Sequence, residues 1–178
     1  LIKLGNDQPR FQFGLDLNAS WKGFDMRVFF QGVGKRDFWP GYVAFWASSN
    51  QNIWYMLGFE EHLDYFRNTP SGDLDVNLDS YYPRPLLNAK NQYMQTKYLQ
   101  DASYIRLKNF TFGYTIPQKY TQRIKVANLR LFFTGENLWT GTRLSSVFDP
   151  EGINGNDKIS GIGYPIMKTW ACGLTITL

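Results

Sequence analysis

The alternation of side chains near the end of the sequence limits most strongly what this chain can fold into. From Trp170 to Leu178 the even positions are apolar, whereas from Thr169 to Thr177 the odd positions are only Thr, Ala and Gly. A period of two indicates a β-strand with two unlike faces. Here the apolar face is the bulky one. This pattern is typical of a transmembrane β-barrel strand, which has lipid outside and a wet lumen inside.

The composition argues against several other classes of protein. No apolar run reaches the roughly 18 residues of a membrane-spanning helix, and a mean hydropathy of -0.37 is compatible with barrel strands, half of whose residues are polar. A single cysteine, Cys172, predicts neither a disulfide framework nor a zinc site. A net charge of +4 with scattered Lys and Arg does not predict nucleic-acid binding. We expect no cofactor and no enzymatic activity, because no nucleophile or metal constellation is present.

Alternation also marks earlier strands. One runs from Phe11 to about Trp21 and a return strand begins at Phe24. Two more are predicted from Ala102 to Ile116 and from Leu129 to about Trp139, before the final strand at 165–178. A dozen residues is long for a soluble strand but suits a tilted membrane crossing. The parity of the apolar residues changes near Asn109, which predicts either a β-bulge there or a strand whose upper part leaves the membrane.

The connections between these strands alternate in length. Lys22-Gly23 and residues 117–126 are short, whereas residues 33–101 and 140–164 are long. Outer-membrane barrels have short periplasmic turns and long external loops. We therefore predict an all-β fold, in which residues 1–178 are the C-terminal part of an antiparallel transmembrane β-barrel and the two long connections are extracellular. A short helix is expected at 59–67.

Five strands would leave two edges with unpaired backbone groups in lipid. We therefore expect the remaining strands of the barrel to come from elsewhere in a longer polypeptide. The opening residues also do not read as a signal peptide. We therefore expect this chain to hold about the last five strands of a larger barrel.

Five ordered motifs resemble the C-terminal part of SusC/RagA-type TonB-linked outer-membrane proteins of Bacteroidetes. The longest is DASYIRLKNFTFGYTIP, from Asp101 to Pro117. The others, in chain order, are Pro9–Phe11 with Gly14–Leu15 and Trp21–Asp25; Asn128–Leu131 with Thr134–Leu138; Asp149–Glu151; and Gly163–Pro165. The resemblance covers nearly the whole chain except the interior of the 33–101 loop.

The resemblance implies a 22-stranded barrel closed by an N-terminal plug, in the outer membrane of a Gram-negative bacterium of the Bacteroidetes type. It implies import of oligosaccharides, or sometimes peptides, with a SusD-like surface lipoprotein as a lid and the TonB complex as the energy source. The plug and the TonB box are not in this chain. The alternative is a soluble all-β carbohydrate-binding module, which has difficulty with strands this long.

Aromatic residues gather in the first long loop, and they leave two interpretations open. Flat rings stack on sugar faces, so a substrate-binding platform is one. The other is that the rings pack the loop or contact the lipoprotein lid. The candidate substrate-binding residues are Trp39, Tyr42, Trp46, Trp54 and Tyr55.

The acidic residues predict structure rather than chemistry. The segment Asp73–Asp79 resembles the start of a calcium loop, but Leu78 stands where glycine is needed, and the twelfth position is Arg84. Asp149 and Glu151 flank Pro150, and we expect them to order the last external loop through hydrogen bonds to backbone amides. The one histidine, His62, is expected on the surface of a helix.

The parity of the strands divides side chains between lipid and lumen. Amphipathic rings near strand ends, such as Trp21 and Trp139, suit an interfacial girdle. The residues expected to face lipid are Phe110, Phe112, Tyr114, Trp170, Leu174, Ile176 and Leu178. Asp16, Asn18, Arg27, Arg130 and Glu136 lie on the opposite parity, where they would stabilise the plug or touch substrate.

Overall fold

The computed structural model describes residues 2–41, 43–47, 58–86, 89–153, 164 and 166–178. The chain divides into two compact units. The first, called here the sheet unit, comprises Gln8–Arg36, Asp101–Leu144 and Tyr164–Leu178. The second, called here the loop unit, comprises Leu1–Asp7, Asp37–Gln100 and Ser145–Gly163.

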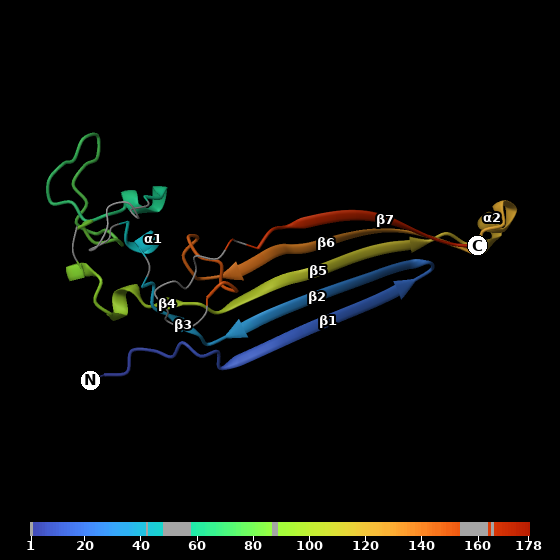
Figure 1. Cartoon of the computed structure of the whole chain (residues 1–178), viewed down its shortest axis with the longest axis horizontal. Helices are drawn as coiled ribbons and strands as arrows, with labels where there is room; N and C mark the ends of the chain where they lie inside the picture. The colour runs from blue at the N-terminus through green and yellow to red at the C-terminus, as the bar shows by residue number, and fades with distance from the viewer. Residues whose placement is uncertain (1, 42, 48–57, 87–88, 154–163, 165) are drawn as a thin grey trace. The chain divides into compact units, whose positions relative to one another are not determined.

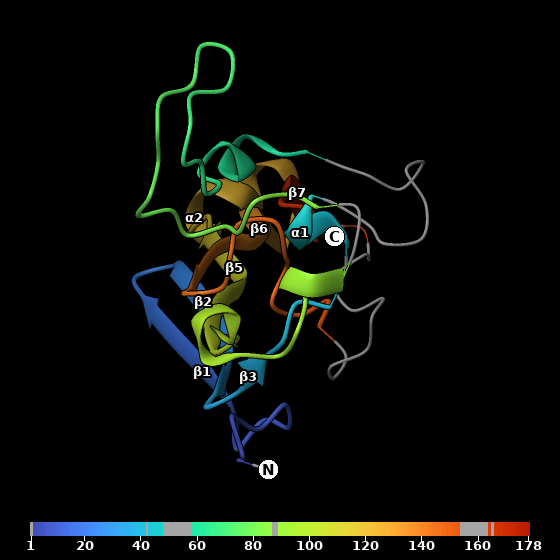
Figure 2. The same ribbon diagram turned by 90° about the vertical axis from the view of Figure 1, so that its left-hand side faces the viewer.

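The sheet unit is built on one five-stranded antiparallel sheet with the order β1-β2-β5-β6-β7 (Figure 1). Viewed end-on, the strands follow one another in a row from β1 to β7 (Figure 2). The all-β antiparallel prediction is confirmed. The strands are β1 (Phe11–Trp21), β2 (Phe24–Gly34), β5 (Tyr104–Thr115), β6 (Asn128–Thr142) and β7 (Thr169–Thr177).

The two outer edges of this sheet carry no further strand in the described parts of the chain. There, β1 pairs with β2 and β7 pairs with β6, each on one side only. The backbone N–H and C=O groups that point outward from β1 and β7 therefore lack ladder partners.

A two-residue turn joins β1 to β2. Lys22 and Gly23 have φ angles of 47° and 89°, as a tight hairpin with the twist of its strands requires. Gly23 also has no room for a side chain, because a Cβ there would lie 2.8 Å from the carbonyl oxygen of Thr115. The N–H of Thr115 donates to the carbonyl of Gly23 at 2.7 Å, which ties the turn to the end of β5.

The connection between β5 and β6 leaves from the same end of the sheet. It contains the short helix α2 (Gln118–Thr121) and the 3-10 turn η5 (Gln122–Ile124). The turn ends at Lys125 with φ 56°, a left-handed conformation. Backbone bonds from Ile116 to Leu129 and from Ala127 to Thr177 close this connection onto the ends of β6 and β7. Both short connections therefore share one end of the sheet.

The predicted irregularity near Asn109 is confirmed as a shift in strand register. Between β2 and β5 the register changes at Phe29/Phe30, and between β5 and β6 it changes between Leu107 and Asn109. Opposite this point on β6, Asn137 has φ 53°. A bulge of this kind moves the side chains that follow it to the other parity, which is why Leu107 and Phe110 share a face.

The loop unit has little regular structure. Its elements are β3 (Asp37–Phe38), α1 (Val43–Trp46), η2 (Glu60–Leu63), η3 (Ala89–Asn91) and η4 (Thr96–Tyr98), and β3 pairs with β4 (Gln100–Asp101). The helix expected at 59–67 is only the one-turn η2, after which Tyr65 and Arg67 form bridges with Tyr82 and Asn77. No helix among the described residues is long and apolar enough to cross a membrane.

Aromatic side chains form the core of the loop unit. Phe45 is fully buried and contacts the rings of Trp46, Tyr82, Tyr98 and Phe148 at centroid distances of 4.9 to 6.2 Å. Phe38 adds an edge contact to Phe148 at 5.2 Å. These rings bury large apolar areas in a unit with few backbone ladders, so packing is what holds the loop unit together.

Candidate functional site

The two faces of the sheet differ in chemistry along their whole length. In an antiparallel sheet, residues paired across strands lie on the same face. The register aligns Trp21, Phe24, Tyr114, Leu131 and Leu174 in one row across all five strands. The next row is Ala19, Met26, Phe112, Phe133 and Cys172. The five strands therefore form one continuous apolar face.

This apolar face is exposed in the described structure. Leu174 is 54% exposed and Leu131 is 50% exposed, although they pair with each other within an apolar row. The rings of Phe24 and Tyr114 lie 4.4 Å apart, and those of Phe133 and Trp170 lie 5.3 Å apart. Contiguous exposed apolar surfaces of this extent are rare on soluble monomers and mark a surface that something apolar covers.

The residues that the sequence analysis assigned to the lipid side and that belong to strands lie on this apolar face. Phe110, Phe112 and Tyr114 come from β5, and Trp170, Leu174 and Ile176 from β7; Leu178 follows β7 and is exposed.

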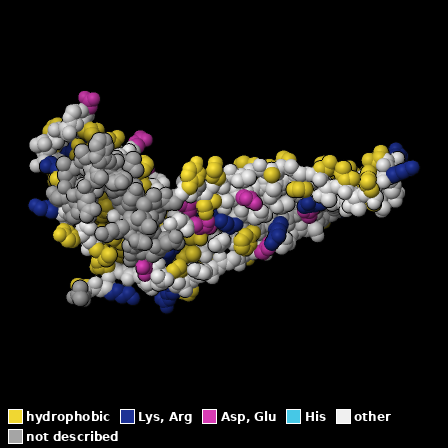
Figure 3. Space-filling model, in the orientation of Figure 1, with side chains coloured by type: hydrophobic (Ala, Val, Ile, Leu, Met, Phe, Trp, Pro, Cys, Tyr) yellow, Lys and Arg dark blue, Asp and Glu magenta, His cyan; other side chains and the backbone are white. Residues whose placement is uncertain are grey.

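Four charged side chains on the opposite face form two ion pairs. The Arg27 guanidinium on β2 binds the Asp16 carboxylate on β1, with Nη2 2.6 Å from Oδ2. Arg130 on β6 binds Asp25 on β2, with Nε donating to Oδ1 at 2.9 Å and Nη2 to Oδ2. Figure 3 shows positive and negative side chains next to each other along the sheet. These paired charges cancel, so this part of the face offers polar groups without a strong net charge.

The Asp25–Arg130 pair joins β2 to β6 across the intervening strand β5, because β5 has a glycine at this point. Gly113 on β5 pairs with Asp25, and Arg130 reaches over it from β6. A Cβ at Gly113 would lie 2.5 Å from Nη2 of Arg130 and 2.7 Å from Oδ1 of Asp25. Only a residue without a side chain leaves this space. The alternation pattern of the sequence does not indicate this role of Gly113.

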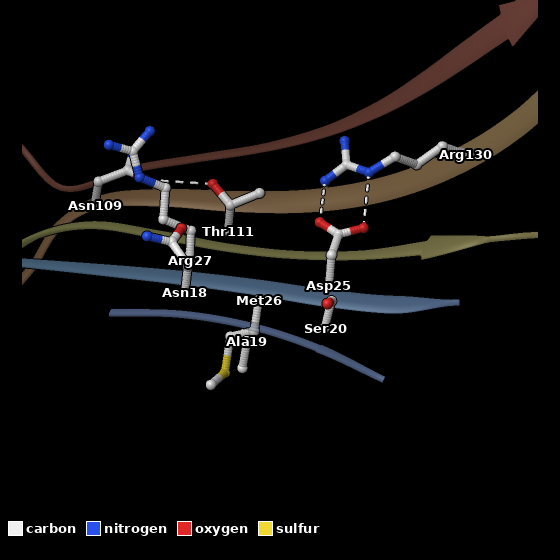
Figure 4. Close-up of a pocket in the computed structure, with 9 residues that line it drawn as sticks. All are labelled: Asn18, Ala19, Ser20, Asp25, Met26, Arg27, Asn109, Thr111 and Arg130. Carbon is white, nitrogen blue, oxygen red and sulfur yellow. Dashed lines mark hydrogen bonds and ion pairs between the residues drawn. The ribbon is translucent and has the colours of Figure 1, made fainter. Parts of the chain in front are cut away.

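An open pocket of about 590 Å³ lies along this polar face. Figure 4 shows Asp25, Arg27, Thr111 and Arg130 on one side of the sheet and Ala19 and Met26 on the other. Thr111 also lines the pocket and shares a hydrogen bond of 3.0 Å with Thr134 between their Oγ1 atoms. Of the residues assigned to the lumen side, Asn18, Arg27 and Arg130 line the pocket, and Glu136 lies farther along β6. The pocket can accept and donate hydrogen bonds, and it carries charges of both signs.

The candidate sugar-stacking residues have different positions. Trp39 and Trp46 are 7% and 4% exposed, and their rings lie 5.6 Å apart. The indole N–H of Trp46 donates to the carbonyl of Pro40 at 2.7 Å. Burial therefore leaves little of either ring for a sugar to stack on. Tyr42, Trp54 and Tyr55 lie outside the described residues.

His62 was predicted on a helix surface, and this prediction is wrong, because the side chain is buried. Its Nδ1 accepts a hydrogen bond from the backbone N–H of Phe59 at 2.9 Å, and its Nε2 lies 2.9 Å from the carbonyl oxygen of Phe45. The Nδ1 contact requires a lone pair, so Nε2 carries the hydrogen and donates a hydrogen bond to the Phe45 carbonyl. His62 therefore links η2 to the aromatic core.

Asp64 is a second ordering residue that sequence analysis missed. Its carboxylate accepts hydrogen bonds from the N–H of Tyr81 at 3.0 Å and from the Asn77 amide at 2.8 Å. These bonds, the Tyr81 N–H first, hold the pKa of Asp64 below its ordinary value. The hydrogen bonds within the loop unit therefore stabilise the ionised form of the Asp64 carboxyl group. Burial has the opposite effect on the neighbouring phenols and raises the pKa of Tyr81 and Tyr82.

The acidic residues of the last long loop make a local turn. Asp149 Oδ1 accepts a hydrogen bond from the backbone N–H of Glu151 at 2.9 Å, and the Asp149 carbonyl accepts from Gly152. Among the described residues, no group of three His, Cys, Asp or Glu side chains is arranged to hold a metal ion.

Comparison with known proteins finds similarity to TonB-dependent receptors. No family model matches the sequence. The chain is 27% identical to TonB-dependent receptor P3 of Formosa agariphila, over 97% of this chain, and 29% identical to TonB-dependent receptor P26 of the same organism, over 99%. It spans 17% and 18% of the length of those relatives.

Solved structures match the fold over a similar extent. The RagAB peptide importer in its open-open state superposes with a TM-score of 0.68 at 20% identity, covering 98% of this chain and 18% of that one. A further structure of the RagAB peptide transporter gives a TM-score of 0.63 at 22% identity, covering 97% of this chain and 18% of that one. In sequence this chain is therefore similar to part of two TonB-dependent receptors, and in fold it is similar to part of the RagAB importer.

Proposed function

We propose that this chain forms about the last five strands in the barrel of an outer-membrane importer that takes its energy from the TonB complex. The observation that carries the proposal is the continuous apolar face, aligned by register across five strands and opposed by a polar face of paired charges. A barrel wall between lipid and a wet lumen requires these two faces on the same strands. The role is transport rather than catalysis.

In this proposal the apolar rows meet the lipid of a Gram-negative outer membrane of the Bacteroidetes type. The two short connections then lie at the periplasmic side, and the long connections, 33–101 and 140–164, are extracellular. Trp21 and Trp170 would lie at the membrane interfaces, where amphipathic rings are favoured.

The polar pocket would face the lumen. We infer that Arg27, Asp16, Asp25 and Arg130 mainly order the wall and offer hydrogen bonds to the plug, because each charge already has a partner in the sheet. Asp149 and Glu151 would order an external loop through the local turn. For substrate contact, Tyr42, Trp54 and Tyr55 remain candidates, whereas the burial of Trp39 and Trp46 supports a packing role.

The cargo that we propose is an oligosaccharide, delivered under a SusD-like surface lipoprotein. The resemblance to SusC-type proteins supports it. A peptide is the second candidate, and the likeness in fold to the RagAB peptide importer favours it. The two cargoes are separated by a growth experiment. A strain that lacks the full-length protein is compared with the same strain after complementation, on glycans or on peptides as the sole nutrient, and the nutrient on which only the deletion strain fails to grow identifies the cargo.

The membrane assignment is tested with a matched pair of variants in the full-length protein. Leu174→Arg places a charge on the apolar face and is expected to cost about 2–4 kcal/mol near the bilayer midplane. Thr175→Arg, one residue along on the polar face, should be far milder. Outer-membrane fractionation and the yield of assembled barrel measure both effects. Equal effects, or recovery of the full-length protein in solution without detergent, would overturn the assignment.

A further inference from the structure

The end of the sheet that carries the short connections also carries a group of basic side chains. These are Lys22 in the β1–β2 turn and Lys119, Arg123 and Lys125 in the connection from β5 to β6, here called the basic end. All four are exposed. No acidic residue occurs from Ile116 to Leu129. Figure 3 shows Lys and Arg side chains at the tip of the space-filling view, where Figure 1 places α2.

These cations differ from those farther along the sheet. Arg27 and Arg130 bind carboxylates. Among the described residues, no ion pair joins a cation of the basic end to a carboxylate. Two of the cations lie against aromatic rings: Lys22 Nζ is 4.9 Å from the Trp21 ring centre and Lys119 Nζ is 4.7 Å from that of Tyr120. Their charge is therefore not balanced by an acidic side chain. The basic end presents a net positive surface, whereas the paired arginines do not.

Exposed apolar side chains lie beside these cations. Trp21 is 68% exposed, Tyr120 is 58% exposed and Ile124 is 65% exposed. Trp21 belongs to the apolar row that runs across the sheet. Aromatic and apolar side chains mixed with Lys and Arg are the composition of a surface that lies at the headgroup level of a bilayer.

The backbone at two of these cations is in a conformation that favours other residues. Lys22 has φ 47° and Lys125 has φ 56°. Glycine or asparagine fills left-handed turn positions with less strain than a long side chain does. Lysine in both turns at this end is therefore consistent with a use for its charge.

We propose that the basic end binds the phosphate groups of anionic phospholipids in the membrane leaflet that it faces. The argument is charge complementarity: unpaired cations that are flanked by exposed Trp, Tyr and Ile match an anionic headgroup above an acyl chain. This inference rests on the proposed membrane function, since it places the short connections at a bilayer surface.

The test uses the full-length protein, purified in detergent and freed of lipid, and titrates it with phosphatidylglycerol or phosphatidylcholine. Native mass spectrometry counts the bound lipid. The triple variant Lys119→Gln, Arg123→Gln and Lys125→Gln should weaken phosphatidylglycerol binding by about fivefold per charge removed. Phosphatidylcholine binding should not change. A variant with Lys119→Arg and Lys125→Arg should bind phosphatidylglycerol as the parent does.

The matched control removes the same charge elsewhere, as Lys3→Gln, Lys35→Gln and Lys168→Gln, three exposed cations outside the basic end. Equal lipid binding by both triple variants overturns the inference. Displacement of phosphatidylglycerol by inorganic phosphate, or loss of uptake with lipid binding intact, also overturns it, because the surface would then serve a free anion or a protein. Outer-membrane fractionation of each variant is scored separately, so absence from the membrane refutes the proposed function itself.

Discussion

Gly113 provides the sharpest test of how the polar face is built. Glycine inside a strand is usually less stable than alanine by about 0.5–1 kcal/mol, so local preference alone predicts that Gly113→Ala stabilises the protein. The structure predicts the opposite sign. The new Cβ would lie 2.5 Å from Arg130 Nη2 and 2.7 Å from Asp25 Oδ1, closer than real carbon contacts. The two flexible side chains must move apart.

The size of the effect follows from the exposure of the pair. The side chains of Arg130 and Asp25 are 28% and 36% exposed, between surface pairs worth up to about 1 kcal/mol and buried pairs whose disruption costs about 3–5 kcal/mol. We take about 1–2 kcal/mol for the lost pair. After subtraction of the strand preference, Gly113→Ala should destabilise the barrel by up to about 1.5 kcal/mol.

A double-mutant design separates the two terms. In the background Asp25→Ala with Arg130→Ala the space above Gly113 is open, so Gly113→Ala should now stabilise by about 0.5–1 kcal/mol. The assay is denaturant unfolding of the full-length barrel in lipid vesicles, followed by tryptophan fluorescence. Stabilisation by the same amount in both backgrounds would refute the argument from geometry.

Three further outcomes are expected in the loop unit. Trp46→Ala should destabilise it by about 3–5 kcal/mol, seen as faster limited proteolysis, because a buried ring is lost; weaker cargo binding at unchanged proteolysis would instead mean that Trp46 contacts cargo. His62→Ala leaves the Phe59 N–H and the Phe45 carbonyl without their partner and should cost about 1–3 kcal/mol for each group in the same assay, whereas no change would contradict its linking role. Because the folded pKa of Asp64 is depressed, its contribution is present above the ordinary value of 3.8 and is lost as the pH falls through the folded value. Proteolysis of the parent should therefore accelerate in acid more than that of Asp64→Asn, and equal acceleration would contradict this assignment.

The sequence predicts the sheet well because a period of two reports on faces directly. Alternation within each strand groups Phe112 with Tyr114 and Leu174 with Ile176 on an apolar side, and the parity change near Asn109 locates the bulge. The Asp25–Arg130 pair is different. Its members are 105 positions apart, and they meet because two strand registers and Gly113 bring them together.

The loop unit is harder to predict from sequence for a physical reason. An aromatic residue in a loop looks the same in the sequence whether its ring packs in a core or binds a ligand. Trp39 and Trp46 therefore allowed two interpretations. His62 lacks any periodic context, and its burial depends on carbonyl and amide groups that other segments bring to it.

The unpartnered outer edges of β1 and β7 have a practical consequence for work on this segment. Produced alone in water, the segment would present two rows of unsatisfied backbone groups along with an uncovered apolar surface. Copies would then add strand to strand from either side, and growth would have no natural stopping point. Fibrils or inclusion bodies are therefore the expected product of the isolated segment, and its native fold is best studied inside the intact barrel.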